Sequence, residues 1–328
     1  MPSRDFDYLD GGSIRVELQA AVAQYRHWDA QQLEREQKES RVTVPLYQYT
    51  DWKGLCGIIE SQSVWFTDYR HLNDPSELAH GVDVADDVLT ALAHGADRRV
   101  GLFLQMVGDL LIPKNFVGSL DFFTASFTKQ RDDLSQWRAY GNNGRGFALG
   151  FSPRMFEVVD GAGLEPNEIS FLGPVLYDRQ AIFARHQRAI AAAASIFLAA
   201  AEAHGGLMAD KRVGIPFIRR MADELIASPL IWNCITSKHI GYESEREVRL
   251  VLMGQTCKLA PYVRTRLRGS ERVPYVAHPF RVREPGAIFE IVVGPSAASD
   301  AKERVDQMLK SHGLANVSVT RSEIPYRG

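Results

Sequence analysis

The segment LYQYTDWKGLCGIIESQSVWFT, from Leu46 to Thr67, decides the fold class because two periodicities meet in it. Its two ends, residues 46–50 and 63–67, are short runs rich in aromatic and β-branched residues, which is typical of strands. Between them, apolar residues recur at the spacing of one helix face, at Trp52, Leu55, Ile58 and Ile59. The segment therefore predicts a strand, a helix and a second strand, with Thr50 as a candidate N-cap of the helix.

The rest of the chain continues this mixture without a regular alternation of strand and helix. We expect further strands at residues 122–127, 146–151, 245–253, 288–293 and 316–321. We expect helices within residues 76–111, 133–140, 179–226 and 298–312. An irregular mixture favours an α+β fold, so we predict a mixed, mainly antiparallel central sheet with helices packed around it.

The beginning of the chain differs from the rest in composition. Residues 16–39 are rich in Ala, Gln, Glu and Arg, and apolar positions are thin along one helical face. We predict an N-terminal helical extension over residues 1–44, followed by a single, catalytic-like α+β domain over residues 45–328. Within that domain, residues 179–226 form a helical insertion with a break at Gly205 and Gly206.

Composition argues against several broad classes of protein. The formal net charge is −2, so no global basic field makes nucleic acid the default partner. The three cysteines, Cys56, Cys234 and Cys257, are too scattered for a disulfide framework or a zinc knuckle, and the nine histidines form no ligand-spaced cluster. The most apolar stretch, residues 189–201, is shorter than a membrane span. We therefore expect a cytoplasmic protein with no membrane segment and no metal site.

The predicted strand near residue 247 carries the densest set of charged side chains. Glu245, Glu247 and Arg249 share one face of such a strand, and apolar residues occupy the other. One interpretation is a solvated sheet face on which Arg249 neutralises the two carboxylates. The other is a carboxylate pair placed over a ribose, where it stabilises an oxocarbenium-like state.

Three further segments have both a structural and a ligand-binding interpretation. In the strand at residues 122–127, Ser126 lies in a row of hydroxyls that suits either ligand binding or an edge strand. Trp137 and Tyr140 form either an aromatic wall or part of the core. Gly146, Ala148 and Gly150 leave one strand face nearly bare, so that a ligand or another backbone can come close.

The remaining candidates are polar residues near the opening strand and one basic segment. Gln48 shares a face with Thr50 and can hydrogen-bond a ligand. Asp74 and Glu77 form a predicted capping box, and Asn73 and Asp74 can also bind a hydroxyl. The arginine-rich segment at residues 264–283 is either a solvated loop or a contact for a macromolecular acceptor such as nucleic acid.

Taken in order, these segments resemble a bacterial family known as domain of unknown function 2971. The matching residues are Leu46 to Thr50, Leu72 to Glu77, Ser126, Leu134 to Gly141, Gly146 to Phe151, Lys238, Glu245 to Arg249, Ile291 to Pro295 and Ser322 to Tyr326. The resemblance spans residues 45–326, and the ordered set of motifs is specific.

The order of these motifs is also similar to that of ADP-ribosyltransferases, which implies split sheets and NAD as the substrate. By that analogy, Glu245 and Glu247 are the catalytic candidates, and Gln48 and Thr50 contact the nicotinamide ribose. Gln48 stands where such enzymes often have a charged residue. The other NAD-binding candidates are Tyr47, Tyr49, Asn73, Asp74, Ser126, Trp137, Tyr140 and Arg249.

The resemblance thus implies an ADP-ribosyltransferase or NAD glycohydrolase that acts as a bacterial toxin or defence effector. Two alternatives stay open on the sequence. One is a non-enzymatic module that binds a nucleotide or a partner protein, and the other is a metal-dependent nucleic-acid enzyme.

Overall fold

The computed structural model describes residues 14–72, 77–111, 120–156, 169–278 and 285–328. The chain packs into two compact units. The helical unit comprises residues 1–39, 73–120 and 176–241, and the sheet unit comprises residues 40–72, 121–175 and 242–328. Packing into units does not decide which segments fold on their own, so the domain boundaries at residues 44 and 45 stay a prediction.

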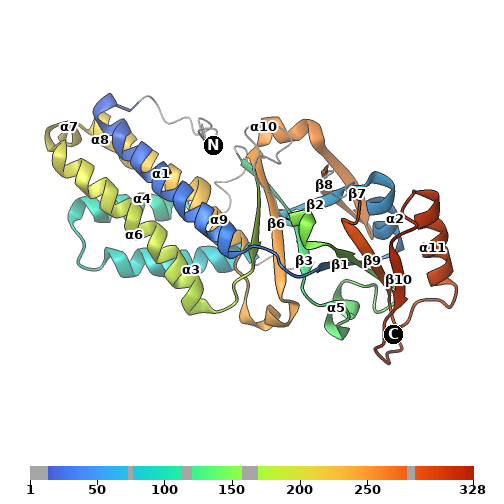
Figure 1. Ribbon diagram of the computed structural model, residues 1–328. Helices are drawn as coiled ribbons and strands as arrows, with labels where there is room; N and C mark the ends of the chain where they lie inside the picture. The colour runs from blue at the N-terminus through green and yellow to red at the C-terminus, as the bar shows by residue number, and fades with distance from the viewer. Residues whose placement is uncertain (1–13, 73–76, 112–119, 157–168, 279–284) are drawn as a thin grey trace. The chain divides into compact units, whose positions relative to one another are not determined.

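The helical unit is built from antiparallel and crossing helices (Figure 1). Its helices are α1 Val16–Glu39, α3 Glu77–Ala93, α4 Arg98–Leu110, α6 Arg179–Ala203, α7 Gly205–Ala209, α8 Lys211–Leu225 and α9 Ile231–Ile235, with a wider turn at Ile226–Leu230 between the last two. Aspartates cap several of them, since the side chains of Asp97, Asp178 and Asp210 accept backbone N–H groups of the first turns. The predicted helices are present, and α6 ends just before Gly205.

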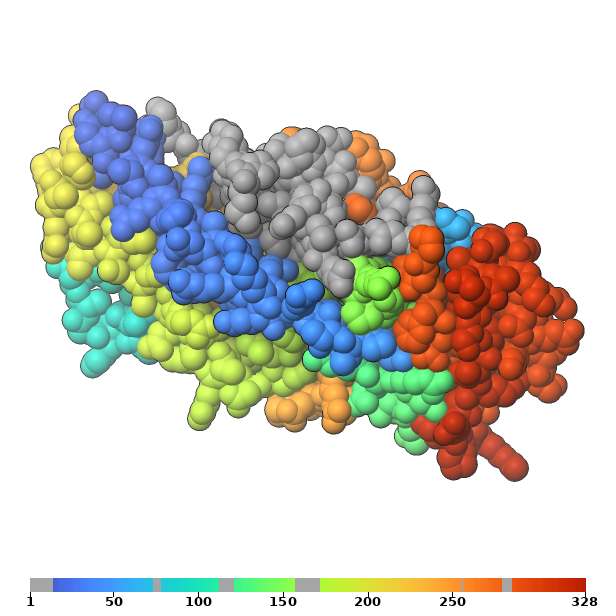
Figure 2. Space-filling view, in the orientation of Figure 1, coloured from blue at the N-terminus to red at the C-terminus, as the bar shows by residue number. Residues whose placement is uncertain are grey.

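Long-range ion pairs fix α1 within the helical unit. Arg26 makes a two-pronged pair with Glu224 of α8, at 2.8 and 2.9 Å. Arg185 of α6 donates to Glu36, and Trp232 of α9 donates its indole N–H to the same carboxylate at 2.9 Å. Figure 2 shows α1, in blue, lying along the yellow helices of this unit. Because few apolar residues of α1 are available for packing, charge-assisted hydrogen bonds add to its attachment within the helical unit.

A buried histidine gives the helical unit an expected pH dependence. His186 of α6 is fully buried, neither ring nitrogen has a hydrogen-bond partner among the described residues, and burial lowers its pKa to about 3. Below an unfolded pKa of about 6.5, the unfolded chain binds a proton that the folded chain does not, so the free energy of unfolding falls as pH falls from 6.5 towards 3.

We therefore expect acidification from about pH 7 to pH 5 to cost roughly 2 kcal/mol through His186. Urea unfolding at both pH values measures this cost in the wild type and in His186→Leu. The variant lacks the titrating group, so its loss of stability over the same interval should be smaller by about that amount. An equal loss in both proteins would contradict the assignment.

The sheet unit contains a ten-stranded sheet. Its strands are β1 Leu46–Thr50, β2 Val64–Asp68, β3 Leu120–Thr128, β4 Phe147–Phe151, β5 Ile169–Pro174, β6 Glu247–Gln255, β7 Val263–Arg268, β8 Glu271–His278, β9 Ile288–Val293 and β10 Ser318–Arg321. The main path runs β10-β9-β4-β1-β3-β2-β8-β7, and β6 pairs with both β3 and β5. β9 and β10 are parallel, whereas the other pairs with a determined register are antiparallel. The predicted α+β class with a mixed, mainly antiparallel sheet is confirmed.

Short helices of the sheet unit connect its strands. They are α2 Trp52–Ser61, α5 Leu134–Ala139, α10 Thr256–Leu259 and α11 Ala301–Ser311, together with single 3₁₀ turns that include Ile240–Glu245. The prediction that Thr50 caps α2 is wrong. Asp51 is the N-cap, and its carboxylate accepts the backbone N–H of Gly54 at 2.7 Å, because a charged acceptor next to the first turn outcompetes the preceding hydroxyl.

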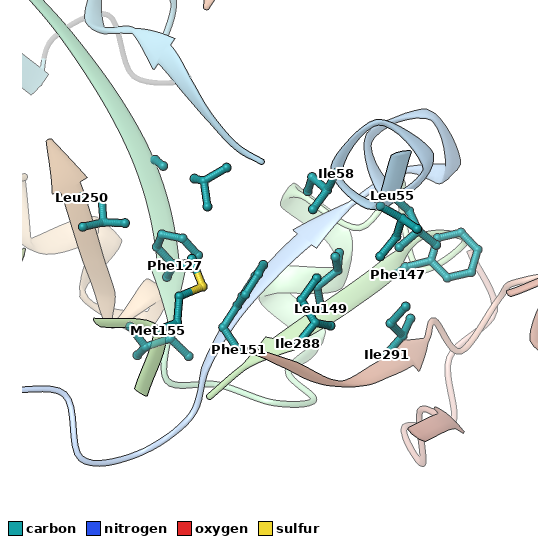
Figure 3. Close-up of a cluster of buried hydrophobic side chains, with 14 of the residues drawn as sticks. Leu55, Ile58, Phe127, Phe147, Leu149, Phe151, Met155, Leu250, Ile288 and Ile291 are labelled. Atoms are coloured by element: carbon teal, nitrogen blue, oxygen red, sulfur yellow. The ribbon is translucent and has the colours of Figure 1, made fainter. Parts of the chain in front are cut away.

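One face of the sheet carries the main hydrophobic core of this unit. Leu55 and Ile58 of α2 pack with alternate residues of the strands, and Figure 3 shows Phe127, Phe151 and Leu250 within the same cluster. Because successive strand residues point to opposite faces, this core fixes which side chains remain for the other face.

Among the described residues, no helix has both the length and the apolar character needed to cross a lipid bilayer.

Candidate functional site

The face of β3 and β6 opposite the main core is polar. Phe123, Ala125 and Phe127 enter the core from β3, and Val248, Leu250 and Leu252 enter it from β6. By alternation, the opposite face carries Thr124, Ser126 and Thr128 of β3, with Glu247 and Arg249 of β6. We call these five residues the β3–β6 polar face. The hydroxyl of Thr124 is buried there without a hydrogen-bond partner among the described residues.

Glu247 and Arg249 form a buried ion pair on this face. Arg249 donates Nε to Oε1 of Glu247 at 2.6 Å and Nη2 to Oε2 at 2.9 Å. The exposed fractions of the two residues are 7% and 1%. Two parallel charge-assisted hydrogen bonds hold both side chains in one geometry and compensate the carboxylate charge. Arg249 neutralises Glu247 as the first interpretation expected, but the pair is buried, whereas that interpretation expected a solvated sheet face.

Glu245 is held differently, because it precedes the strand. It ends the 3₁₀ turn Ile240–Glu245, so the expectation that β6 includes it and that it shares a strand face with Glu247 is wrong. The hydroxyl of Tyr140 donates to Oε1 of Glu245 at 2.7 Å. The main-chain carbonyl of Glu245 accepts from Thr128 Oγ1 at 2.7 Å and from Gln136 Nε2 at 3.4 Å. A half-buried carboxylate is therefore fixed through both its side chain and its backbone.

The residue between the two glutamates has an uncommon backbone conformation. Arg246 has φ +44°, in the left-handed region that L-residues with a Cβ enter at a cost. This turn separates the 3₁₀ segment from β6 and lets Glu245 and Glu247 point in directions that a continuous strand would not allow. The alternation of side chains between strand faces does not apply to Glu245, because β6 begins only at Glu247.

We expect Arg246→Gly to be more stable than Arg246→Ala by about 1 kcal/mol, since only glycine adopts this φ without a Cβ penalty. Both variants lose the same exposed side chain, so the pair isolates the backbone effect. Denaturant unfolding of the two purified variants measures the difference. Equal stabilities, or a more stable alanine variant, would show that residue 246 is not held in the left-handed region.

Tyr47, Tyr49 and Trp137 are packed together in a second cluster with Ala148 and Val292. Trp137 is fully buried, meets the Tyr49 ring edge-on at 4.7 Å and donates its indole N–H to Asp132 at 2.6 Å. Burial raises the pKa of Tyr49, whose hydroxyl donates to the carbonyl of Gln130. The bare strand face at Ala148 is thus filled by α5 rather than open to solvent.

A buried carboxylate next to Tyr47 was not foreseen from the sequence. Glu290 of β9 accepts from the Tyr47 hydroxyl at 2.8 Å and from Nη2 of Arg131 at 3.0 Å. Arg131 also donates to Oγ1 of Thr320. Burial and then the bond to Glu290 raise the pKa of Tyr47, so it stays protonated as a donor. Gly150 leaves room for the side chain of Glu290, because a Cβ at position 150 would lie 2.8 Å from Cγ of Glu290.

The predicted ligand contacts in β1 lie on two opposite faces of that strand. Tyr47 lies opposite Thr128 in the register, on the polar side, whereas Gln48 lies opposite Leu149 of the main core. Alternation places Thr50 with Gln48. Gln48 donates to the carbonyl of Ser126 at 3.5 Å, and its Oε1 is buried without a partner among the described residues.

The structure therefore brings together only part of the predicted site. Ser126, Glu247 and Arg249 share the β3–β6 polar face, and Tyr140 meets Glu245 at its end. The predicted contacts Asn73 and Asp74 lie outside the described residues. Within residues 14–72, 77–111, 120–156, 169–278 and 285–328, no group of three or more His, Cys, Asp or Glu side chains is placed to hold a metal ion.

Comparison with known proteins gives one match. Residues 136–250 match the model of a family described as Protein of unknown function (DUF2971). Over these residues the match confirms the resemblance to domain of unknown function 2971 inferred from the sequence, and the matched stretch contains Tyr140, Glu245, Glu247 and Arg249. No curated protein and no solved structure matches the chain.

Proposed function

We propose that the sheet unit of this chain, whose residues 136–250 match the DUF2971 family model, cleaves the N-glycosidic bond of NAD. The products are nicotinamide and ADP-ribose, which passes to water or to a macromolecular acceptor. The single observation that supports this proposal is the way in which Glu245 is held. Tyr140 donates to its carboxylate, and the side chains of Thr128 and Gln136 donate to its main-chain carbonyl. A fixed, half-buried carboxylate suits the stabilisation of a developing oxocarbenium ion.

The chemistry requires only groups that lie near Glu245. The bond between the ribose anomeric carbon and the nicotinamide nitrogen breaks, and its electron pair leaves with nicotinamide. The positive charge left on the ribose is stabilised by the carboxylate of Glu245. An acceptor oxygen then attacks the anomeric carbon and loses its proton to solvent or to a carboxylate. We assign the leading role to Glu245, because its side chain is half-buried, whereas that of Glu247 is buried in the pair with Arg249.

The remaining groups of the face have supporting roles in this proposal. Tyr140 is half-buried and next to Glu245, so its ring is the aromatic candidate for the nicotinamide side. Ser126 is half-buried and is the candidate for a ribose contact, and the buried Glu247–Arg249 pair supports the face structurally. Tyr47, Tyr49 and Trp137, which the sequence offered as NAD contacts, support the site by packing in this account.

A second candidate is a module that binds a nucleotide without turnover. The observation in its favour is the ion pair of Glu247 with Arg249, which compensates the charge of one of the two predicted catalytic carboxylates. A thermal shift with NAD detects binding in either case, because a ligand that binds only the folded state raises its stability. Mass spectrometry of the NAD after long incubation then separates the two candidates. Nicotinamide excludes the module, and a shift with intact NAD excludes the enzyme.

The biological setting belongs to the same proposal. We place the reaction in the cytoplasm and expect the protein to act as a toxin or defence effector through loss of NAD or modification of an acceptor. The metal-dependent nucleic-acid enzyme stays an alternative without a specific observation in its favour among the described residues.

A further inference from the structure

The hairpin of β7 and β8 concentrates positive charge in the sheet unit. Figure 1 shows the two strands as neighbouring orange ribbons, and β8 pairs with β2 on its other side. The strands are joined at Gly269 and Ser270, and Gly269 has φ +63°, as a two-residue hairpin turn requires. One interpretation of residues 264–283 was a solvated loop, but the described part is a paired ribbon. Arg281 and Arg283 lie outside the described residues.

The charge on this hairpin is mostly of one sign. Arg264, Arg268 and Arg272 are exposed, and Arg266 is half-buried. Glu271 is the single acidic residue of the sequence between positions 263 and 278. It pairs with Arg268 at 2.9 Å, but both side chains are more than 40% exposed, so this pair holds little free energy in water. The ribbon therefore keeps a net positive charge in a chain whose total is −2.

Edge position alone would explain some of these arginines. β7 ends the strand order of the sheet, and charged residues on an edge strand prevent pairing with other chains. Such protection needs charge but no aromatic partner. The hairpin has both, and the aromatic partner is what distinguishes a binding surface from a guarded edge.

Trp65 and Tyr275 form an aromatic pair beside the arginines. Their ring centroids lie 4.9 Å apart, and the guanidinium of Arg266 lies 5.3 Å from Trp65 and 5.7 Å from Tyr275. Nη2 of Arg266 also donates to Thr67 Oγ1 at 2.9 Å, which fixes the guanidinium against the rings. Both rings are half-buried. Arginines next to a fixed aromatic pair are the combination that binds unpaired bases and their phosphates.

We infer that the β7–β8 hairpin binds single-stranded nucleic acid, with Arg264 and Arg268 at phosphates and Tyr275 stacked on a base. The register places these two arginines on the same face of the ribbon as Arg266 and Tyr275. The positive ribbon requires a polyanion by charge complementarity. The aromatic pair favours nucleic acid over an acidic peptide, because a carboxylate chain has no ring to stack. The inference does not rest on NAD cleavage, since none of these residues belongs to the β3–β6 polar face.

The test uses the full chain and a fluorescently labelled oligothymidylate, with binding followed by anisotropy over a range of salt concentrations. Changing Arg264 and Arg268 together to Gln should weaken binding about tenfold. It should also reduce the slope of log affinity against log salt by about 1.4, since each lost phosphate contact on a single strand removes about 0.7. The matched control changes Arg98 and Arg188, two exposed arginines of the helical unit, to Gln and should bind within about twofold of wild type.

Two more variants keep the inference falsifiable if the glutamine variant folds poorly. Replacing Arg264 and Arg268 by Lys keeps the charge and should preserve the salt slope. Tyr275→Leu should weaken binding about tenfold at an unchanged slope, because it removes stacking alone. The inference is overturned if wild type does not bind at about 50 mM salt. It is equally overturned if the hairpin and control glutamine variants lose binding alike, or if polyglutamate displaces the oligonucleotide at equal charge.

Discussion

Glu245→Gln is expected to lower the rate of nicotinamide release from NAD by about 100-fold or more, while the protein stays folded. The amide keeps the size of the side chain and can still accept from Tyr140, so the local structure is preserved. It removes the negative charge that stabilises the oxocarbenium ion. The rate is measured by chromatography of nicotinamide, and circular dichroism of the same samples reports the fold.

The matched control for this prediction is Glu247→Gln, two residues away. If Glu245 leads, Glu247→Gln should reduce the rate less than Glu245→Gln and should act mainly on stability, because it weakens the pair with Arg249. The opposite ranking would transfer the leading role to Glu247. Full activity in both variants would remove both carboxylates from the mechanism.

Arg249→Met is expected to destabilise the sheet unit by about 3–5 kcal/mol, the largest stability effect in this account. The substitution keeps most of the side-chain volume but takes the two-pronged donor away from a carboxylate that is 7% exposed. Denaturant unfolding followed by tryptophan fluorescence measures the loss.

The double variant Glu247→Leu/Arg249→Met is the control for that loss. It removes the buried carboxylate together with its donor, so we expect it to recover at least half of the destabilisation. A single variant as stable as wild type would mean that the pair is not buried in solution. A double variant no better than the single one would place the cost in packing rather than in charge.

Much of the fold followed from local pattern. The run from Leu46 to Thr67 gave strand, helix and strand at nearly the observed bounds, because its apolar residues follow the period of each element. The family was also recognised from ordered motifs, and residues 136–250 match it. Alternation along β6 placed Val248, Leu250 and Leu252 in the core as expected.

The parts that were missed depend on contacts between distant segments. Glu290 pairs with Arg131, which lies 159 positions away, and no local pattern connects them. A lone acid within the apolar strand IFEIVV was a signal that could have marked Glu290 as buried and paired. The left-handed turn at Arg246 had no such signal, since the residue there is neither Gly nor Asn.

The division of the opening strand shows how far order-based analogy reaches. The order of motifs suggested that Gln48 and the late glutamates meet one ligand. The register instead places Gln48 opposite Leu149, and the residues on the same face as Ser126 and Thr128 are Tyr47 and Tyr49. One-residue differences in register move a side chain to the other face, so motif order alone does not fix a site.

The most direct test of the central claim is the amount of nicotinamide that the purified full chain releases from NAD, with and without cell extract. The account predicts time-dependent release by wild type and none above background by folded Glu245→Gln. Intact NAD after prolonged incubation with wild type under both conditions would contradict it, as would equal release by wild type and Glu245→Gln.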